Sequence, residues 1–160
     1  MTTTIREDRW PEFFSGLTDG GVRLGPSEWV SLSQLEVDLY GGLIADLDPM
    51  HNDPGWQAGI DRWGGTIIIG SHLLSMLPGF LRERGFPVGR GDVRYEPLSL
   101  PRVRFVAPLP IGHRARDTMR VLEVTKGERS WTVRTEHTVE REGLERPFLF
   151  AELVSRFSEV

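Results

Sequence analysis

The feature that most constrains this chain is an apolar run at 67–81, broken only by Gly70, Ser71, His72, Ser75, Pro78 and Gly79. A helix that crosses a membrane needs about 20 apolar residues, so the run is too short to span a bilayer. A helix that is hydrophobic on nearly all sides is stable only when it is buried. We therefore expect 67–81 to form the central helix of a protein core.

After this run, the hydrophobic pattern changes to that of strands. Segments rich in Val, Thr, Phe and Trp predict antiparallel strands at 103–106, 118–124, 130–140 and 147–157. Lys126-Gly127 and Glu142-Gly143 are the expected hairpin turns, and 28–32 is a further short strand. One buried helix followed by hairpin-joined strands predicts an α+β fold, in which an antiparallel sheet curls around the helix.

A helix and an unusual loop precede the central run. The helix is expected at 34–45, with Ser31 or Ser33 as its N-cap. Four apolar side chains recur at three- and four-residue spacing and share one helical face: Leu35, Leu39, Leu43 and Ile44. The next segment, 46–54, is so rich in Asp, Asn and Pro that it cannot continue the helix, and it predicts a structured loop.

Length and composition narrow the class of protein. The 160 residues are 39% hydrophobic and 26% charged, which predicts a single domain over 1–160. The net charge is -4, with acids and bases interspersed, and this argues against nucleic acid as a partner. Cysteine is absent, and no stretch has the pattern of a signal peptide or a membrane span. We therefore expect a cytoplasmic protein without a membrane partner.

A local excess of basic residues follows the central run. It comprises Arg102, Arg104, Arg114 and Arg116. These cations could hold a small phosphorylated ligand, or they could form a solvated strand face, which is the more ordinary arrangement.

Two motifs carry a family resemblance. Residues 45–54 read Ala-Asp-Leu-Asp-Pro-Met-His-Asn-Asp-Pro, and 64–70 read Gly-Gly-Thr-Ile-Ile-Ile-Gly. In this order they resemble the MaoC-like dehydratases, the family of (R)-specific enoyl-CoA hydratases, and within it the branch similar to nodulation protein N. That family has Gly-Asp-x-Asn-Pro-x-His-x-Asp-Pro followed by Gly-Gly-Thr-Ile-Ala-His-Gly. The resemblance implies a hot-dog fold and Asp46 and His51 as catalytic residues.

Several positions depart from the family pattern. Ala45 stands where Gly is usual, and Ile69 stands where the family mostly has His or another polar residue. Ser71 and His72 replace a bulky apolar pair. Because these positions lie beside the expected site of the substrate carbonyl, they bear on the identity of the substrate more than on the fold.

The implied chemistry is hydration of an α,β-unsaturated thioester, which needs a base, an acid and donors for the thioester oxygen. Asp46 and His51 would supply the acid and the base, and the sequence does not say which residue is which. The backbone N–H of Gly70, at the start of the buried helix, is the expected oxyanion donor. Ile69, Ser71 and His72 are the other candidates for substrate contact.

More ordinary roles for these residues remain open. Asp46 could cap a turn, and His51 and His72 could be packed core histidines. Asp48 and Asp53 are expected to be turn and N-cap residues. A metal site made of Asp46, His51 and Asp53 is conceivable, but the family chemistry requires neither a metal nor a cofactor, and we expect none.

Ser71, His113 and His137 give weaker indications of a catalytic role. Ser71 lacks the Gly-x-Ser-x-Gly turn of a serine nucleophile. His113 and His137 are expected on a turn and a strand, with no partner evident in the sequence.

We therefore expect a hydratase or dehydratase that acts on 2-enoyl or (3R)-hydroxyacyl thioesters, with coenzyme A favoured over an acyl carrier protein. One alternative is an enzyme of the same fold that acts on a non-thioester small molecule, and another is a non-catalytic subunit that binds a ligand. Hot-dog proteins commonly pair two copies through sheet edges, so a homodimer is expected.

Overall fold

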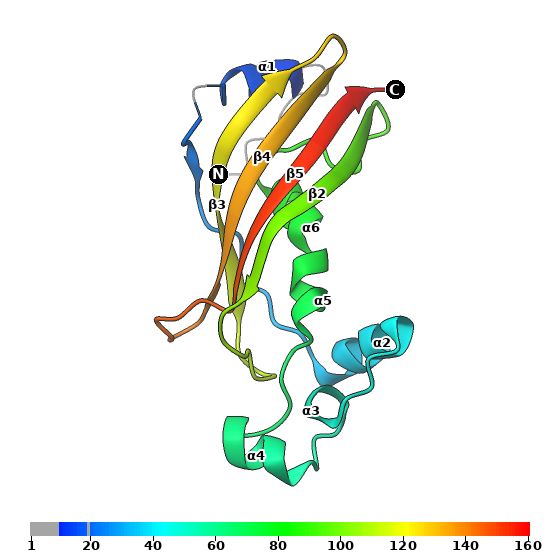
Figure 1. The fold of residues 1–160 in the computed structure, drawn as a ribbon, viewed down its shortest axis with the longest axis vertical. Helices are drawn as coiled ribbons and strands as arrows, with labels where there is room; N and C mark the ends of the chain where they lie inside the picture. The colour runs from blue at the N-terminus through cyan, green and yellow to red at the C-terminus, as the bar shows by residue number, and fades with distance from the viewer. Residues whose placement is uncertain (1–9, 19) are drawn as a thin grey trace.

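An antiparallel sheet and a pair of helices along one of its faces form the centre of the computed structural model, which describes residues 10–18 and 20–160 (Figure 1). The strand order is β1-β3-β4-β5-β2. The strands are β1 (Arg23–Leu24), β2 (Val93–Phe105), β3 (Ala115–Lys126), β4 (Ser130–Arg141) and β5 (Leu149–Glu159). The two central helices are α5 (Gly70–Ser75) and α6 (Leu77–Glu83). This arrangement confirms the predicted α+β architecture.

The other helices lie at the two ends of the sheet (Figure 1). Helix α1 (Trp10–Ser15) lies at one end. At the opposite end are α2 (Gln34–Ile44), α3 (Pro49–Asn52) and α4 (Gln57–Trp63). Among the described residues, no helix is both long enough and apolar enough to cross a membrane.

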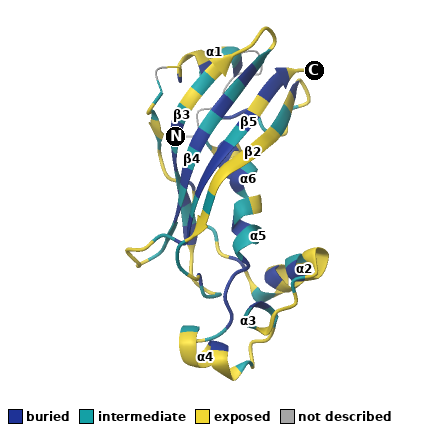
Figure 2. Cartoon of the chain, viewed as in Figure 1, coloured by how far each residue is buried: buried dark blue, intermediate teal, exposed yellow. Residues whose placement is uncertain are grey.

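The core lies between the sheet and α5–α6. Alternate residues of β3 and β4 are buried, which is the two-residue period of a sheet with one face in the core. Leu73, Leu77 and Phe80 of the central helices are almost completely buried and belong to the same hydrophobic cluster as Val133 and Leu149. The sheet therefore covers one side of the apolar run, whereas Ser75 and Gly79 are exposed, so the run is less completely buried than predicted (Figure 2).

The central helix is interrupted, which corrects the prediction of one helix over 67–81. Residues 67–69 are extended, and α5 and α6 meet at Met76. Pro78 has no N–H to continue the helical ladder, and the break falls two residues before it, so that Pro78 lies in the first turn of α6. The extended segment is available for contacts that helical residues could not make.

Strand β2 is longer than predicted, whereas β3, β4 and β5 match their predictions to within a few residues. The pattern indicated only 103–106, but the strand spans Val93–Phe105. Pro97 and Pro101 obscured it, because proline cannot donate to a strand ladder and is confined to edges and bulges. β2 is an edge strand, and its register with β5 shifts on both sides of Ser99. At 28–32 only an isolated bridge forms, between Val30 and Ala115.

Helix α2 begins at Gln34 as predicted and ends at Ile44, one residue before the predicted end, but its apolar side chains are not in the core. Ser33 caps it through a capping box with Glu36. The buried residues of α2 are Val37 and Gly41. The four apolar side chains that the pattern assigned to one face are all exposed, from 44% for Ile44 to 86% for Leu43: Leu35, Leu39, Leu43 and Ile44. In a single chain this face contacts no core (Figure 2).

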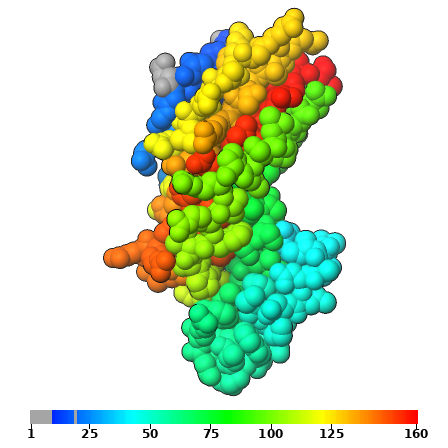
Figure 3. All heavy atoms as spheres, viewed as in Figure 1, coloured from blue at the N-terminus to red at the C-terminus, as the bar shows by residue number. Residues whose placement is uncertain are grey.

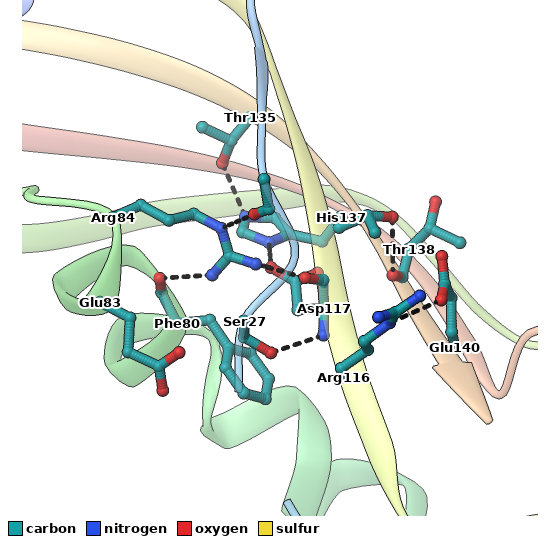
Figure 4. A network of polar contacts seen from close by, with 12 residues as sticks. Ser27, Phe80, Glu83, Arg84, Arg116, Asp117, Thr135, His137, Thr138 and Glu140 are labelled. Atoms are coloured by element: carbon teal, nitrogen blue, oxygen red, sulfur yellow. Dashed lines mark hydrogen bonds and ion pairs between the residues drawn. The ribbon is translucent and has the colours of Figure 1, made fainter. Parts of the chain in front are cut away.

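A buried ionic cluster joins α6 to the sheet (Figure 4). Arg84 Nη2 lies 3.4 Å from Asp117 Oδ2, and the same carboxylate oxygen lies 3.0 Å from His137 Nδ1. His137 Nε2 lies 2.9 Å from Thr135 Oγ1. The side chains of Asp117 and His137 have no exposed surface. His137, for which the sequence showed no partner, thus has two.

Candidate active site

The candidate residues lie where the chain leaves α2 and returns to start α5. Ala45 ends α2 in the left-handed conformation, with φ of 59°, and is the one non-glycine residue with positive φ among 10–18 and 20–160. The loop that follows is partly helical, because Asp48 accepts a hydrogen bond from Met50 N–H at 3.0 Å and caps α3. Asp48 is thus an N-cap as predicted. Figure 3 shows α2, α3 and α4 as a lobe at one end of the molecule.

His51 is held by the extended segment before α5. Its Nδ1 lies 2.8 Å from Ile67 O, and a carbonyl oxygen can only accept, so Nδ1 carries a hydrogen. In the neutral ring, Nε2 is then the nitrogen that can accept a proton. Ile67 N–H also donates to Met50 O at 2.9 Å, so one residue fixes both the α3 backbone and the imidazole. His51 is 7% exposed.

Asp46 is positioned through backbone contacts. Its N–H donates to Gly41 O at 3.0 Å, and its carbonyl oxygen accepts from Asn52 Nδ2 at 3.1 Å. Gly41 makes this packing possible, because a Cβ there would lie 2.7 Å from Asp46 O. The side chain of Asp46 is half-buried and lies at the wall of a cavity.

This cavity, of about 470 Å³, brings together most of the predicted site residues. Its lining residues come from the loop, the segment leading into α5, the end of β2 and the start of β5: Asp46, Met50, His51, Ile67, Ile68, Ile69, Gly70, Ser71, Phe105, Val106, Ala107, Pro108 and Phe148. Asp46 and His51 are its only ionisable side chains among the described residues. A second cavity of about 360 Å³, between the central helices and β2, has no ionisable lining residue except Tyr95.

The start of α5 forms part of the cavity wall at Gly70. As the first residues of a helix, Gly70 and Ser71 have N–H groups without partners inside that helix. The ring of Phe105 lies so close that a Cβ on Gly70 would be 2.7 Å from its Cε1 atom. Only glycine fits between the helix and this ring without displacing it.

His72 lies outside the lining of this cavity. Its ring stacks on Tyr40 of α2, with centroids 4.3 Å apart and planes 9° from parallel. Burial lowers the pKa of His72, and the nearby Glu36 carboxylate partly opposes this effect. The structure thus places His72 between α5 and α2 as a packing residue.

Two other expectations concern ions. Within the described parts of the chain, no three His, Asp or Glu side chains form a group that could hold a metal ion. Arg116 pairs with Glu140 at 2.9 Å and lies over the ring of Trp29, and Arg114 pairs with Glu142. For Arg114 and Arg116, these contacts match the second of the two expected arrangements, a solvated strand face.

Sequence reasoning missed several residues that build the site. Phe105 was placed in a strand without a role, and Phe148 was not singled out. Gln34 and Thr66 were treated as part of a helix and of a motif. Their contacts join segments that are far apart in sequence, so no local pattern indicated them.

Similar proteins support a family assignment. No protein-family model matches the chain. The 3-hydroxyacyl-thioester dehydratase Z of Mycobacterium tuberculosis is 35% identical over 140 residues, covering 86% of this chain and 89% of that protein. Nodulation protein N of Rhizobium leguminosarum bv. viciae is 34% identical over 136 residues, covering 84% of each.

Solved structures share the fold. The (R)-hydratase from A. caviae gives a TM-score of 0.67 at 20% identity, over 85% of this chain and 94% of that one. The MaoC-like dehydratase from Rhodospirillum rubrum gives 0.61 at 16% identity, over 88% and 93%. Together with the sheet around α5–α6, these likenesses define a hot-dog-fold protein. At 35% identity over most of its length to a named dehydratase, the chain belongs to the MaoC-like dehydratase family.

Proposed function

We propose that this protein is a hydratase–dehydratase that interconverts 2-enoyl and (3R)-hydroxyacyl thioesters, with Asp46 and His51 as its proton-transfer pair. The observation that carries the proposal is that both side chains, and no other ionisable group of the described residues, line the cavity beside the start of α5. The names of its relatives, 3-hydroxyacyl-thioester dehydratase and (R)-hydratase, support the reaction type.

In the proposed hydration, a water molecule between Asp46 and His51 loses a proton to one of the pair. The water oxygen bonds to C3 of the enoyl group, and the C2–C3 π electrons move toward the thioester, whose oxygen gains negative charge. The backbone N–H of Gly70 would donate to that oxygen. The proton taken from the water is returned through the pair to C2, so both residues recover their starting protonation states, and dehydration reverses each step.

The fixed tautomer of His51 supports this role. Because Nδ1 donates to Ile67 O, the neutral ring presents Nε2 as a proton acceptor without a prior tautomer change. Asp46 would orient the same water or exchange the proton with it. The mostly apolar wall of Ile67, Ile68 and Ile69 limits the water around the reacting atoms, which strengthens charge interactions there.

Kinetics of the two variants Asp46→Asn and His51→Ala with crotonyl-CoA test the proposal. Each should lower kcat by about 10²-fold or more, and the double variant should lose less than the product of the single losses. Asp53→Asn is the matched control, since Asp53 lies in the same loop, is absent from the cavity lining, and its side chain accepts from Gly55 N–H at 2.9 Å. Parental turnover in either site variant would disprove the assignment.

The carrier and the acyl group belong to the same proposal. We favour coenzyme A over an acyl carrier protein, and a comparison of crotonyl-CoA with the crotonyl carrier protein tests this choice. Ile69 and Ser71 line the cavity where the family has other residues, so a panel of short, long and branched enoyl thioesters should show a defined preference. Activity on unsaturated non-thioester molecules alone would favour the alternative of an enzyme of the same fold that acts on a non-thioester small molecule.

A homodimer of single-domain chains, located in the cytoplasm, completes the proposal. Strand β2 has an open edge with Leu98 and Leu100 each 44% exposed, and the apolar face of α2 is also uncovered. A second copy that paired with β2 would cover such an edge. Sedimentation should give twice 18.1 kDa, and Leu98→Arg should reduce the mass to that of one chain.

A further inference from the structure

The carboxamide of Gln34 joins three segments next to the candidate active site. Its Nε2 donates to His51 O at 2.7 Å and to Asp38 Oδ1 at 2.7 Å. Its Oε1 accepts from Thr66 Oγ1 at 2.6 Å. Gln34 is the first residue of α2, His51 lies in α3, and Thr66 begins the segment that leads into α5.

The chemistry of the partners fixes the orientation of this amide. A backbone carbonyl and a carboxylate can only accept, so the NH₂ group must face His51 O and Asp38. The amide oxygen then faces the Thr66 hydroxyl, which donates to it. Thr66 is buried and Gln34 is half-buried, so water replaces these partners poorly. Glutamine has the length, the donors and the acceptor that this position uses.

The bridge closes a ring of contacts around His51. Gln34 holds the His51 backbone on one side and Thr66 on the other, and the next residue, Ile67, accepts from His51 Nδ1 at 2.8 Å. Ile67 N–H joins the same two segments by donating to Met50 O at 2.9 Å, and Gln34 adds two side-chain hydrogen bonds beside that contact. Gln34 itself does not line the cavity, so any effect on chemistry must act through His51.

We propose that Gln34 is a positioning residue for His51: its carboxamide holds α3 and the Thr66–Ile67 segment together and so keeps the imidazole in the Nδ1–H tautomer with Nε2 directed at the substrate. The catalytic half of this inference rests on the proposed function. The tautomer half does not, because it can be observed without substrate.

The chain offers a matched control. Gln57 of α4 donates from Nε2 to Asp61 Oδ1 at 2.7 Å, which is the same four-residue pair as Gln34 and Asp38. That pair is exposed and lies outside the cavity lining. If Gln34 only stabilises its own helix, removal of either glutamine should have similar small effects.

The experiment compares Gln34→Ala with Gln57→Ala in the full chain. Steady-state kinetics with crotonyl-CoA should show kcat reduced about 10-fold or more in Gln34→Ala, with KM changed less than about 3-fold, because substrate contacts remain while proton-transfer geometry is lost. Gln57→Ala should retain both constants within about 2-fold. Nitrogen NMR of the imidazoles, with the His51 signals assigned by their loss in His51→Ala, should show a single Nδ1–H tautomer in the parent and a mixture in Gln34→Ala.

An unchanged His51 spectrum in Gln34→Ala would overturn the inference, whatever the activity. If the parent shows no hydratase activity but the tautomer still changes, the proposed function fails and the positioning role stands. Gln34→Glu keeps the shape of the side chain, but its carboxylate cannot donate to His51 O. This variant therefore provides the same NMR test if Gln34→Ala does not fold. The same tautomer mixture is expected for it, and a parental spectrum would again overturn the inference.

Discussion

His51 donates its Nδ1–H to the carbonyl oxygen of Ile67 at 2.8 Å. This contact joins the Asp-rich loop to the segment that starts the central helix, and it depends on Ile67 being extended. A central helix that started at Ile67, as the apolar run suggested, would direct that carbonyl along the helix axis. The interruption of the predicted helix is therefore part of how the site is built.

Ala45 lies in a conformation that favours glycine, with φ of 59°. A left-handed conformation costs a residue with a Cβ roughly 1–2 kcal/mol. Ala45→Gly should raise the free energy of unfolding by up to about 1 kcal/mol, because glycine relieves the strain but also raises the entropy of the unfolded chain. The value of kcat should be unchanged. Urea unfolding measures the difference, and lower stability would contradict the role assigned to this position.

Gly41 and Gly42 look equivalent in sequence but not in structure. A Cβ at Gly41 would lie 2.7 Å from Asp46 O and 3.0 Å from Asn52 Oδ1, whereas one at Gly42 would have no neighbour within 4 Å. Gly41→Ala should destabilise the protein by about 1–3 kcal/mol and reduce turnover, because it displaces the loop of Asp46. Gly42→Ala should be neutral or stabilising by up to about 1 kcal/mol. Equal behaviour of the two variants would refute this difference.

The sequence pointed to the proposed reacting residues more readily than to the residues that support them. Asp46 and His51 were proposed from one motif and Gly70 from a second, because each motif is a continuous stretch of the chain. Gln34 and Phe105 act across separations that no local pattern records. Likewise, the periodicity of α2 could not say that its apolar side chains stay uncovered in a single chain, since burial depends on tertiary and quaternary contacts.

The stability of the protein should depend on pH through His72. Burial lowers its folded pKa, so below about pH 6.5 the unfolded chain binds a proton that the folded chain does not. This contribution to stability is present above about pH 6.5 and is lost as the pH falls through the folded pKa. His72→Phe retains a ring against Tyr40, and His72→Gln does not, yet both remove the titration. Urea unfolding at about pH 7.5 and about pH 5.5 should show a smaller acid loss in both variants, and a parental loss would contradict this account.

The ionic cluster around Asp117 should be essential for stability. Asp117→Asn leaves the Arg84 guanidinium, whose side chain is 6% exposed, without its countercharge. Breaking a buried pair in this way costs about 3–5 kcal/mol. The exposed pair of Arg129 and Glu159 is the control, and Glu159→Gln should change the unfolding free energy by less than about 1 kcal/mol. Similar small losses in both variants would show that the cluster contributes little.

The contact between Gly70 and Phe105 should determine how substrates reach the proposed oxyanion donor. A Cβ on Gly70 would lie 2.7 Å from Cε1 and 2.8 Å from Cδ1 of the ring, so Gly70→Ala must displace Phe105. Phe105 is 54% exposed and its ring can move outward, so the fold should survive while the cavity wall changes. We expect kcat/KM for crotonyl-CoA to fall about 10-fold or more, because a shift of about 1 Å at the reacting centre is costly.

A second substitution separates steric displacement from loss of the glycine itself. Phe105→Leu shortens the ring side chain, so in the Gly70→Ala background it should restore part of the lost kcat/KM, although alone it removes apolar wall from the cavity. Such a recovery is an interaction between two residues in contact, and a double-mutant cycle measures it directly. If the two losses simply add, Gly70 acts through its backbone alone. The ring of Phe105 would then shape the choice of acyl group without controlling access to the amide.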